Sequence, residues 1–201
     1  MTDPLTPDLT ALVGSRLCHD LISPLGAIAN GLELLEMSGV GAGPEMQLVT
    51  ESVTGANAKL KFFRVAFGQA SAEQRVGRPE IAAVIAEYTA GGRMTLDWLA
   101  EGDQARRSVK LAFLALLCLE TAMPWGGAIA VRAEADTWTL TAEATRLRDL
   151  APLWALLNGG PLPEDGLAPA QVQFALLPRE AAQQGRRVAA EVTETTIRIT
   201  F

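Results

Sequence analysis

The sequence predicts an α+β fold, in which an N-terminal hairpin of two long helices precedes an α/β sandwich. The first observation is a pair of long amphipathic segments, 5–37 and 45–75, joined by a short glycine-rich stretch at 38–44. The second is a change of pattern after the hairpin, where shorter helical segments alternate with strand-like runs. Together they predict one domain over 1–76 and another over 77–201.

The two helices of the hairpin are expected to lie antiparallel, because the stretch that connects them is short. The first should begin near Leu5, with Asp8 or Thr10 as its cap, and should end at Met37. The second should run from Glu45 to about Arg75. A lone hairpin cannot bury its apolar stripe on both sides, so two copies are expected to pair into a four-helix bundle.

The second domain is predicted to form one sheet with helices on one face, its strands pairing mostly as antiparallel hairpins. Helices are expected at 79–90, 104–123, 148–158 and 169–184, and strands at 93–98, 128–134, 137–144, 187–192 and 195–201.

Composition argues against several functional classes. The net charge is −6 and no long basic cluster occurs, which disfavours nucleic acid or an anionic membrane as partner. Cys18 and Cys118 are far apart in a chain with one histidine, so no metal site is expected. Two cysteines without a secretory signal indicate a reducing cytoplasm. The longest apolar run, 111–119, is far shorter than the ~20 residues that span a bilayer.

The single histidine, His19, is predicted to lie on the solvent face of the first helix. At ~100° per residue, with His19 at zero, an apolar stripe falls between about 140° and 240°. Its members are Leu17, Leu21, Pro24, Leu25, Ile28, Leu32 and Leu35. The residues within about 60° of His19 are Arg16, Ser23, Gly26, Asn30 and Glu33. Such a position suits a nucleophile that must meet a bulky partner, although a surface histidine without a role remains an alternative.

The neighbours of His19 could support phosphoryl chemistry. A neutral imidazole nitrogen is a competent nucleophile toward phosphorus near pH 7. Asp20 could fix the ring tautomer or act as a base, or be only a solvated carboxylate. Arg16, one turn earlier, could neutralise a bound phosphoryl group, or be an ordinary surface arginine. Pro24 should kink the helix just beyond this pair.

The run 18–28 resembles the phosphoacceptor box of two-component histidine kinases, because from His19 it reads His-acidic-Leu-x-x-Pro-Leu-x-x-Ile. The resemblance implies that His19 carries a phosphoryl group. It also implies that Ser23 stands at the position where a polar side chain of these kinases can orient a hydrolytic water. The alternative is that Ser23 is an ordinary surface serine.

The second domain is similar in pattern to the ATP-binding domain of these kinases but lacks its nucleotide-binding residues. Thr121 stands where the metal-binding asparagine is expected, and Pro124 where a lysine is expected. The segment 145–152 has no Asp-x-Gly-x-Gly box, whose glycines let backbone amides approach the phosphates. No nucleotide site is therefore predicted, and the domain is expected to be a degenerate ATPase domain.

The combination resembles the ChpT-type histidine phosphotransferases of alphaproteobacteria, through segments 17–28, 30–35 and 61–68. The resemblance implies a homodimer around a central four-helix bundle. It also implies transfer of a phosphoryl group from the receiver domain of a CckA-like hybrid kinase to response regulators of the CtrA and CpdR type. The chain would need no cofactor of its own, because the receiver supplies Mg²⁺.

The receiver is expected to dock around His19, where small side chains allow close approach. The expected partner-binding residues are Ile22, Gly26, Ala27 and Asn30 of the first helix and Lys59, Phe63 and Arg64 of the second. For the last three, a core position for Phe63 and a solvated face for the charges remain alternatives. For the whole chain, the alternatives are a divergent kinase, a dimeric adaptor that docks receivers without net transfer, and a receiver phosphatase.

Overall fold

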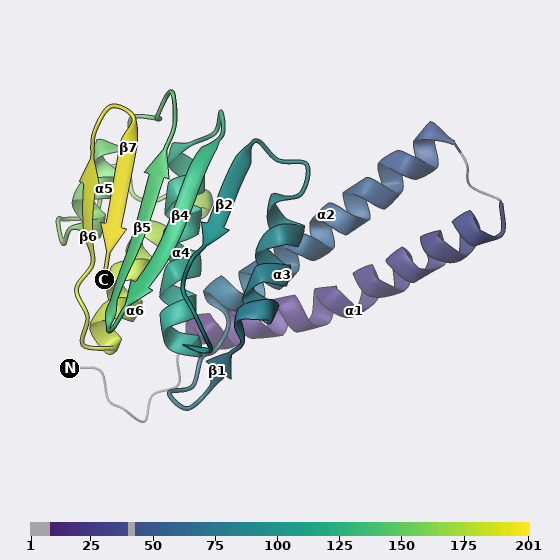
Figure 1. The fold of residues 1–201 in the computed structure, drawn as a ribbon, viewed down its shortest axis with the longest axis horizontal. Helices are drawn as coiled ribbons and strands as arrows, with labels where there is room; N and C mark the ends of the chain where they lie inside the picture. The colour runs from purple at the N-terminus through teal and green to yellow at the C-terminus, as the bar shows by residue number, and fades with distance from the viewer. Residues whose placement is uncertain (1–8, 40–42) are drawn as a thin grey trace. The chain divides into compact units, whose positions relative to one another are not determined.

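The computed structural model describes residues 9–39 and 43–201; within 9–20, only Gly14 is described beyond the backbone. The chain divides into two units (Figure 1). One consists of the described part of Met1–Gln69 together with Ala83–Tyr88, and the other of Ala70–Ala82 and Thr89–Phe201.

Two antiparallel helices, α1 (Leu9–Met37) and α2 (Pro44–Phe67), form the hairpin of the first unit. Pro44 occupies the first turn of α2, where its missing N–H is not needed. Thr10 lies inside α1 and does not cap it, whereas Leu5 and Asp8 lie outside the described residues.

The prediction that the second helix continues to about Arg75 is wrong. Helix α2 ends at Phe67, and Gly68 turns to an extended conformation while its N–H bonds to the Arg64 carbonyl. Residues 69–74 are not helical, and Arg75–Val76 forms a short strand, β1. A glycine at this position lowers helix propensity enough for tertiary structure to decide the end.

Helix α3 (Arg78–Thr89) contributes its later residues to the hairpin unit. The ring of Tyr88 stacks on Phe62 of α2, with centroids 4.0 Å apart. Close by, the Lys61 ammonium pairs with Glu87 at 2.7 Å. Residues 83–88 therefore form a third segment of the hairpin unit.

The second unit is built on a five-stranded sheet in the order β2-β4-β5-β7-β6. Its strands are β2 (Met94–Trp98), β4 (Gly127–Glu134), β5 (Thr137–Glu143), β6 (Ala189–Val192) and β7 (Thr196–Thr200). Strand β2 runs parallel to β4, and the other neighbours are antiparallel. Strand β1 pairs separately with β3 (Gln104–Ala105), two residues that were expected to begin a helix.

Three helices cover one face of the sheet, as predicted (Figure 1). They are α4 (Arg106–Ala122), α5 (Ala151–Leu157) and α6 (Gln173–Gln183), the last preceded by a 3₁₀ turn, Pro169–Gln171. Helix α4 is buried along nearly its whole length. The strands follow the period-two pattern, so that Trp138, Leu140 and Ala142 of β5 are buried.

Across 9–39 and 43–201, no helix combines the length and the apolar character needed to cross a bilayer.

Candidate functional site

Helix α1 carries the predicted phosphotransfer residues. Arg16, His19 and Asp20 all belong to this helix, and the structure describes their backbone but not their side chains. Because α1 is continuous, positions 19 and 20 each lie three or four residues from positions 16 and 23, which places all four on one side of the helix. Pro24 lies inside this helix, and Ser23 before it is exposed.

The surface of α1 beyond position 19 carries small or half-buried side chains. Ala27 and Asn30 are exposed, and Ile22 and Gly26 are partly exposed. A Cβ added to Gly26 would meet no atom within 4 Å. This stretch therefore offers open space to an approaching element.

The predicted residues of α2 lie at the same level of the hairpin as position 19. Two close approaches fix the level: Gly14 lies against Phe67, and Glu36 contacts Thr50, whose hydroxyl is 3.4 Å from the carboxylate. With an equal rise along both helices, the first approach places position 19 level with residue 62 and the second with residue 67, so Phe63 and Arg64 lie near that level. The hairpin thus brings the two sets of predicted partner-binding residues to one level.

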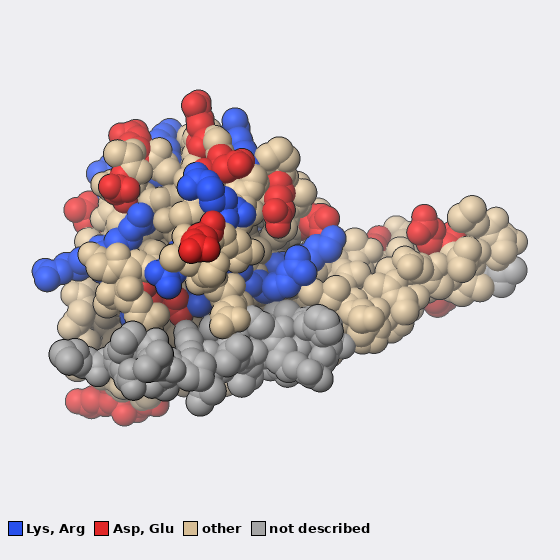
Figure 2. All heavy atoms as spheres, turned by 90° about the horizontal axis from the view of Figure 1, so that it is seen from below, with Lys and Arg blue, Asp and Glu red and all other residues tan. Residues whose placement is uncertain are grey.

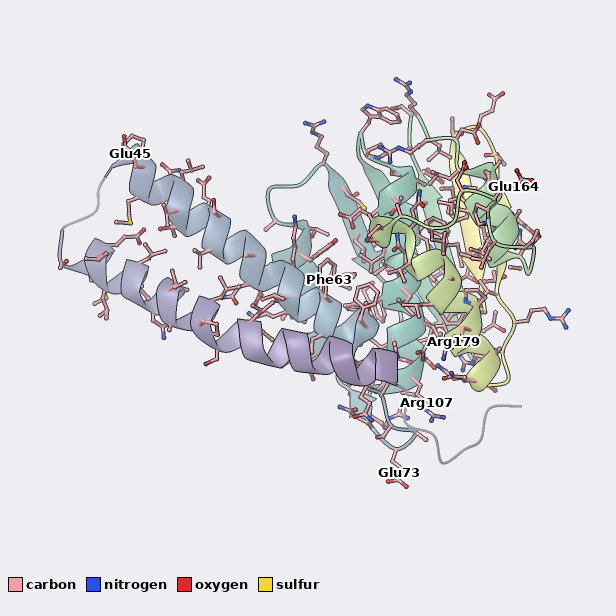
Figure 3. All side chains as sticks on the ribbon, turned by 180° about the vertical axis from the view of Figure 1, so that it is seen from behind. Glu45, Phe63, Glu73, Arg107, Glu164 and Arg179 are labelled. Atoms are coloured by element: carbon pink, nitrogen blue, oxygen red, sulfur yellow. The ribbon has the colours of Figure 1, made fainter. Side chains whose placement is uncertain are left out.

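The exposure of the three α2 residues differs. Lys59 and Arg64 are exposed, whereas Phe63 is half-buried (Figure 3). The Phe63 ring packs edge-on against Phe67, with centroids 5.6 Å apart. Phe63 therefore contributes to packing within the hairpin while part of its ring remains accessible.

Most of the apolar stripe of α1 is uncovered in the hairpin. Of its described members, Leu32 alone is buried, while Leu21, Ile28 and Leu35, each seven residues apart, are 47%, 49% and 40% exposed. Further exposed apolar side chains near the turn are Leu34, Met37, Leu48 and Val49. The turn end of the hairpin shows a mainly uncharged surface (Figure 2). We name Leu21, Ile28 and Leu35 the apolar seam; on a regular helix it lies opposite position 19.

In the second unit, Thr121 is engaged within the fold. Its hydroxyl donates to the Leu117 carbonyl at 2.8 Å and accepts from the Gln173 amide at 2.9 Å. The same buried amide donates to the Ala170 carbonyl. Gln173 therefore links the end of α4 to the start of α6.

A second link joins these helices through charge. The ammonium of Lys110 on α4 lies 2.7 Å from the carboxylate of Glu180 on α6, and the side chains are only 5% and 12% exposed. Sequence reasoning did not single out this pair or Gln173. The available signal was a lysine at the start of an apolar helical run, since a buried charge needs a partner.

Two further polar groups of the second unit serve structural roles. The Asp149 carboxylate accepts the Ala151 N–H at 3.1 Å, at the start of α5. Burial raises the pKa of the Cys118 thiol well above its usual value, so this thiol stays protonated and is a poor nucleophile.

Comparison with known proteins places the chain among phosphotransferases. A family model described as "Histidine phosphotransferase C-terminal domain" matches residues 78–196. The protein phosphotransferase ChpT of Brucella abortus (strain 2308) is 38% identical over 200 residues, covering 94% of this chain and 93% of the relative. A solved structure titled as a bacterial phosphotransferase is similar with a TM-score of 0.70 and 32% identity, covering 98% of each chain.

Proposed function

The chain belongs to the histidine phosphotransferases of the ChpT type, which act in two-component phosphorelays, and we propose that it carries the phosphoryl group on His19. One observation supports this assignment above the others. A histidine phosphotransferase needs a phosphoacceptor histidine, and His19 is the only histidine in the sequence. The test is transfer of acid-labile label from a phosphorylated receiver to the chain, and its loss in His19→Ala.

The transfer would be an in-line displacement at phosphorus. The aspartyl phosphate of the receiver is an acyl phosphate, so its carboxylate is a good leaving group. One nitrogen of neutral His19 forms the N–P bond while the bond from phosphorus to the aspartate oxygen breaks. Asp20 would hold the proton on the other ring nitrogen, and Arg16 would offset the charge of the phosphoryl group. Attack by a second receiver's aspartate on the phosphohistidine reverses these changes.

Positioning would supply most of the catalysis. The receiver brings its own Mg²⁺ and lysine, so the chain has to present the imidazole in line with phosphorus. Docking over Ile22, Gly26 and Ala27 is supported by the open space beside position 26. Asn30 of α1 and Lys59, Phe63 and Arg64 of α2 complete the proposed surface. The receivers would be those of a CckA-like hybrid kinase and of CtrA- and CpdR-type regulators. The interface should be modest, because donor and acceptor must use it in turn.

The hairpin is proposed to pair with that of a second copy. The apolar seam and the apolar residues near the turn support this, because a monomer would leave them in water. Position 19, on the opposite side of α1, would then remain free for a receiver.

Ile28→Asp is expected to convert the dimer to a monomer. Each copy would lose an isoleucine worth about 1.5 to 3 kcal/mol on burial and would place a charge in the seam, so the dimer as a whole should associate at least about a hundredfold more weakly. Light scattering over a concentration series measures the mass. Asn30→Asp, at another exposed α1 position that lies off the seam, is the control and should stay dimeric. A wild-type chain that is monomeric at all concentrations would contradict the proposal.

The second unit is proposed to work without ATP. The engagement of Thr121 with Gln173 supports this, because the hydroxyl is committed to the link between α4 and α6. The cytoplasmic location predicted from the sequence stays a prediction.

Titration with Mg²⁺ and a fluorescent, non-hydrolysable ATP analogue is expected to give no saturable binding. Thr121→Asn should not create binding, because the glycine box is also missing from 145–152. Saturable binding by the wild-type chain would instead favour a divergent kinase.

A further inference from the structure

A cavity of about 560 Å³ opens in the second unit where α5 and α6 end and β6 begins. It is lined by the end of α5 (Leu157, Asn158, Gly159), by Pro178 and Ala182 of α6, and by the turn 185–188. None of these residues belongs to the proposed phosphotransfer surface. None belongs to the segments where a kinase would hold its nucleotide, around Thr121 and 145–152.

The charged lining of this cavity is entirely positive. Arg186 and Arg187 both line it, and no aspartate or glutamate is among the described lining residues. An acidic ligand would therefore meet two guanidinium groups without an opposing carboxylate in the wall.

Arg186 has an unused donor. Its Nη1 is buried, and within the described part of the chain it has no hydrogen-bond partner. Leaving a buried donor unpaired is unfavourable, more so when the group is charged. A rotation of the Arg186 side chain that brings Nη1 to the cavity would therefore pair this donor with an acceptor bound there.

The walls are held in place by hydrogen bonds. The Asn158 side chain donates to the Ala190 carbonyl of β6 at 3.0 Å and accepts the Ala190 N–H at 2.7 Å. The backbone N–H of Arg186 donates to the backbone carbonyl of Ala181, and this hydrogen bond fixes the turn after α6. Buried Leu157 and Val188 add apolar lining. The backbone that carries the two arginines is thus held in place before a ligand binds, which lowers the entropy lost on binding.

We propose that this cavity binds a small phosphorylated molecule, with Arg186 and Arg187 holding the phosphoryl oxygens and the more accessible Pro178 and Ala182 contacting an apolar body. The volume falls in the range of small-molecule sites. A guanidinium fork matches the geometry of a phosphoryl group and binds it with charge-assisted hydrogen bonds. This site does not depend on His19 or on the relay.

Calorimetric titration of the full chain with three probes tests the assignment. The probes are phenyl phosphate, inorganic phosphate and benzoate, which separate the phosphoryl group from the apolar body. Saturable binding of phenyl phosphate is expected, with inorganic phosphate weaker and benzoate weakest. Failure of the chain to bind either phosphate, or tighter binding of benzoate, would overturn the proposal.

Matched arginine variants locate the binding. Arg186→Gln should weaken phenyl phosphate binding at least about tenfold, since a charge-assisted hydrogen bond is lost. Exposed Arg187→Gln should weaken it as well, and it provides a second variant if Arg186→Gln does not fold. Arg132→Gln, an exposed arginine on β4, should bind like wild type. Unchanged binding in both cavity variants would refute the site.

The relay and the cavity can be separated by one more variant. His19→Ala should bind phenyl phosphate as wild type does, whatever its transfer activity. Loss of binding in His19→Ala would place the phosphate at the phosphotransfer surface and contradict the cavity assignment.

Discussion

Replacing His19 by alanine is expected to reduce phosphoryl transfer from a phosphorylated receiver to background. The chain has no other histidine, so no second imidazole can accept the group. The Cys118 thiol cannot substitute, because burial raises its pKa and keeps it protonated. A radiolabelled receiver is mixed with the chain, and the label on the chain is tested for the acid lability and base stability of a phosphohistidine.

His19→Gln is the matched control, because it keeps a polar side chain on α1 while removing the nucleophile. It should also lose transfer but keep receiver binding. Label that persists in both variants would contradict the assignment of His19. Binding without label in the wild-type chain would favour the adaptor alternative.

Breaking the buried pair of α4 and α6 is expected to have the largest effect on stability. Glu180→Ala leaves the Lys110 ammonium, only 5% exposed, without its partner at 2.7 Å. Removing one member of a buried pair typically lowers the free energy of unfolding by about 3 to 5 kcal/mol. Urea unfolding, monitored by tryptophan fluorescence, measures the change.

An exposed pair in the same chain provides the control. Lys61 and Glu87 also lie 2.7 Å apart, but their side chains are 42% and 45% exposed. Glu87→Ala should therefore lower stability by less than about 1 kcal/mol. The double variant Lys110→Met/Glu180→Leu should recover most of the loss, because it leaves no charge buried. A Glu180→Ala chain no less stable than Glu87→Ala would refute the structural role of the pair.

Elements with strong local patterns could be predicted from the sequence. The strand predicted at 93–98 is observed at Met94–Trp98, and the following hairpin agrees within one residue at each end. Alternating side chains define such strands locally. The end of α2 could not be predicted, because 69–75 contains several good helix formers and Gly68 ends the helix only in the context of the fold.

The part of the candidate site that can be predicted from the sequence is the part whose residues lie close together along the chain. The run around His19 lies within eleven residues of one helix, so its pattern predicts a phosphoacceptor from the sequence alone. The links at Lys110 and Gln173 join residues 70 and 52 positions apart with their partners, Glu180 and Thr121. Pairing over such separations depends on how α6 packs on α4, which hydrophobic periodicity does not specify.

The stacking of Tyr88 on Phe62 has a consequence for recombination and for protein dissection. Because Ala83–Tyr88 belongs to the hairpin unit while Ala70–Ala82 does not, the polypeptide crosses between units three times. A gene fragment that stops at codon 76 would encode a hairpin without Tyr88 and Glu87, leaving the Phe62 ring without its stacking partner. A chimera that exchanges either unit between two relatives therefore has to join their sequences at several positions. A single junction would not be sufficient.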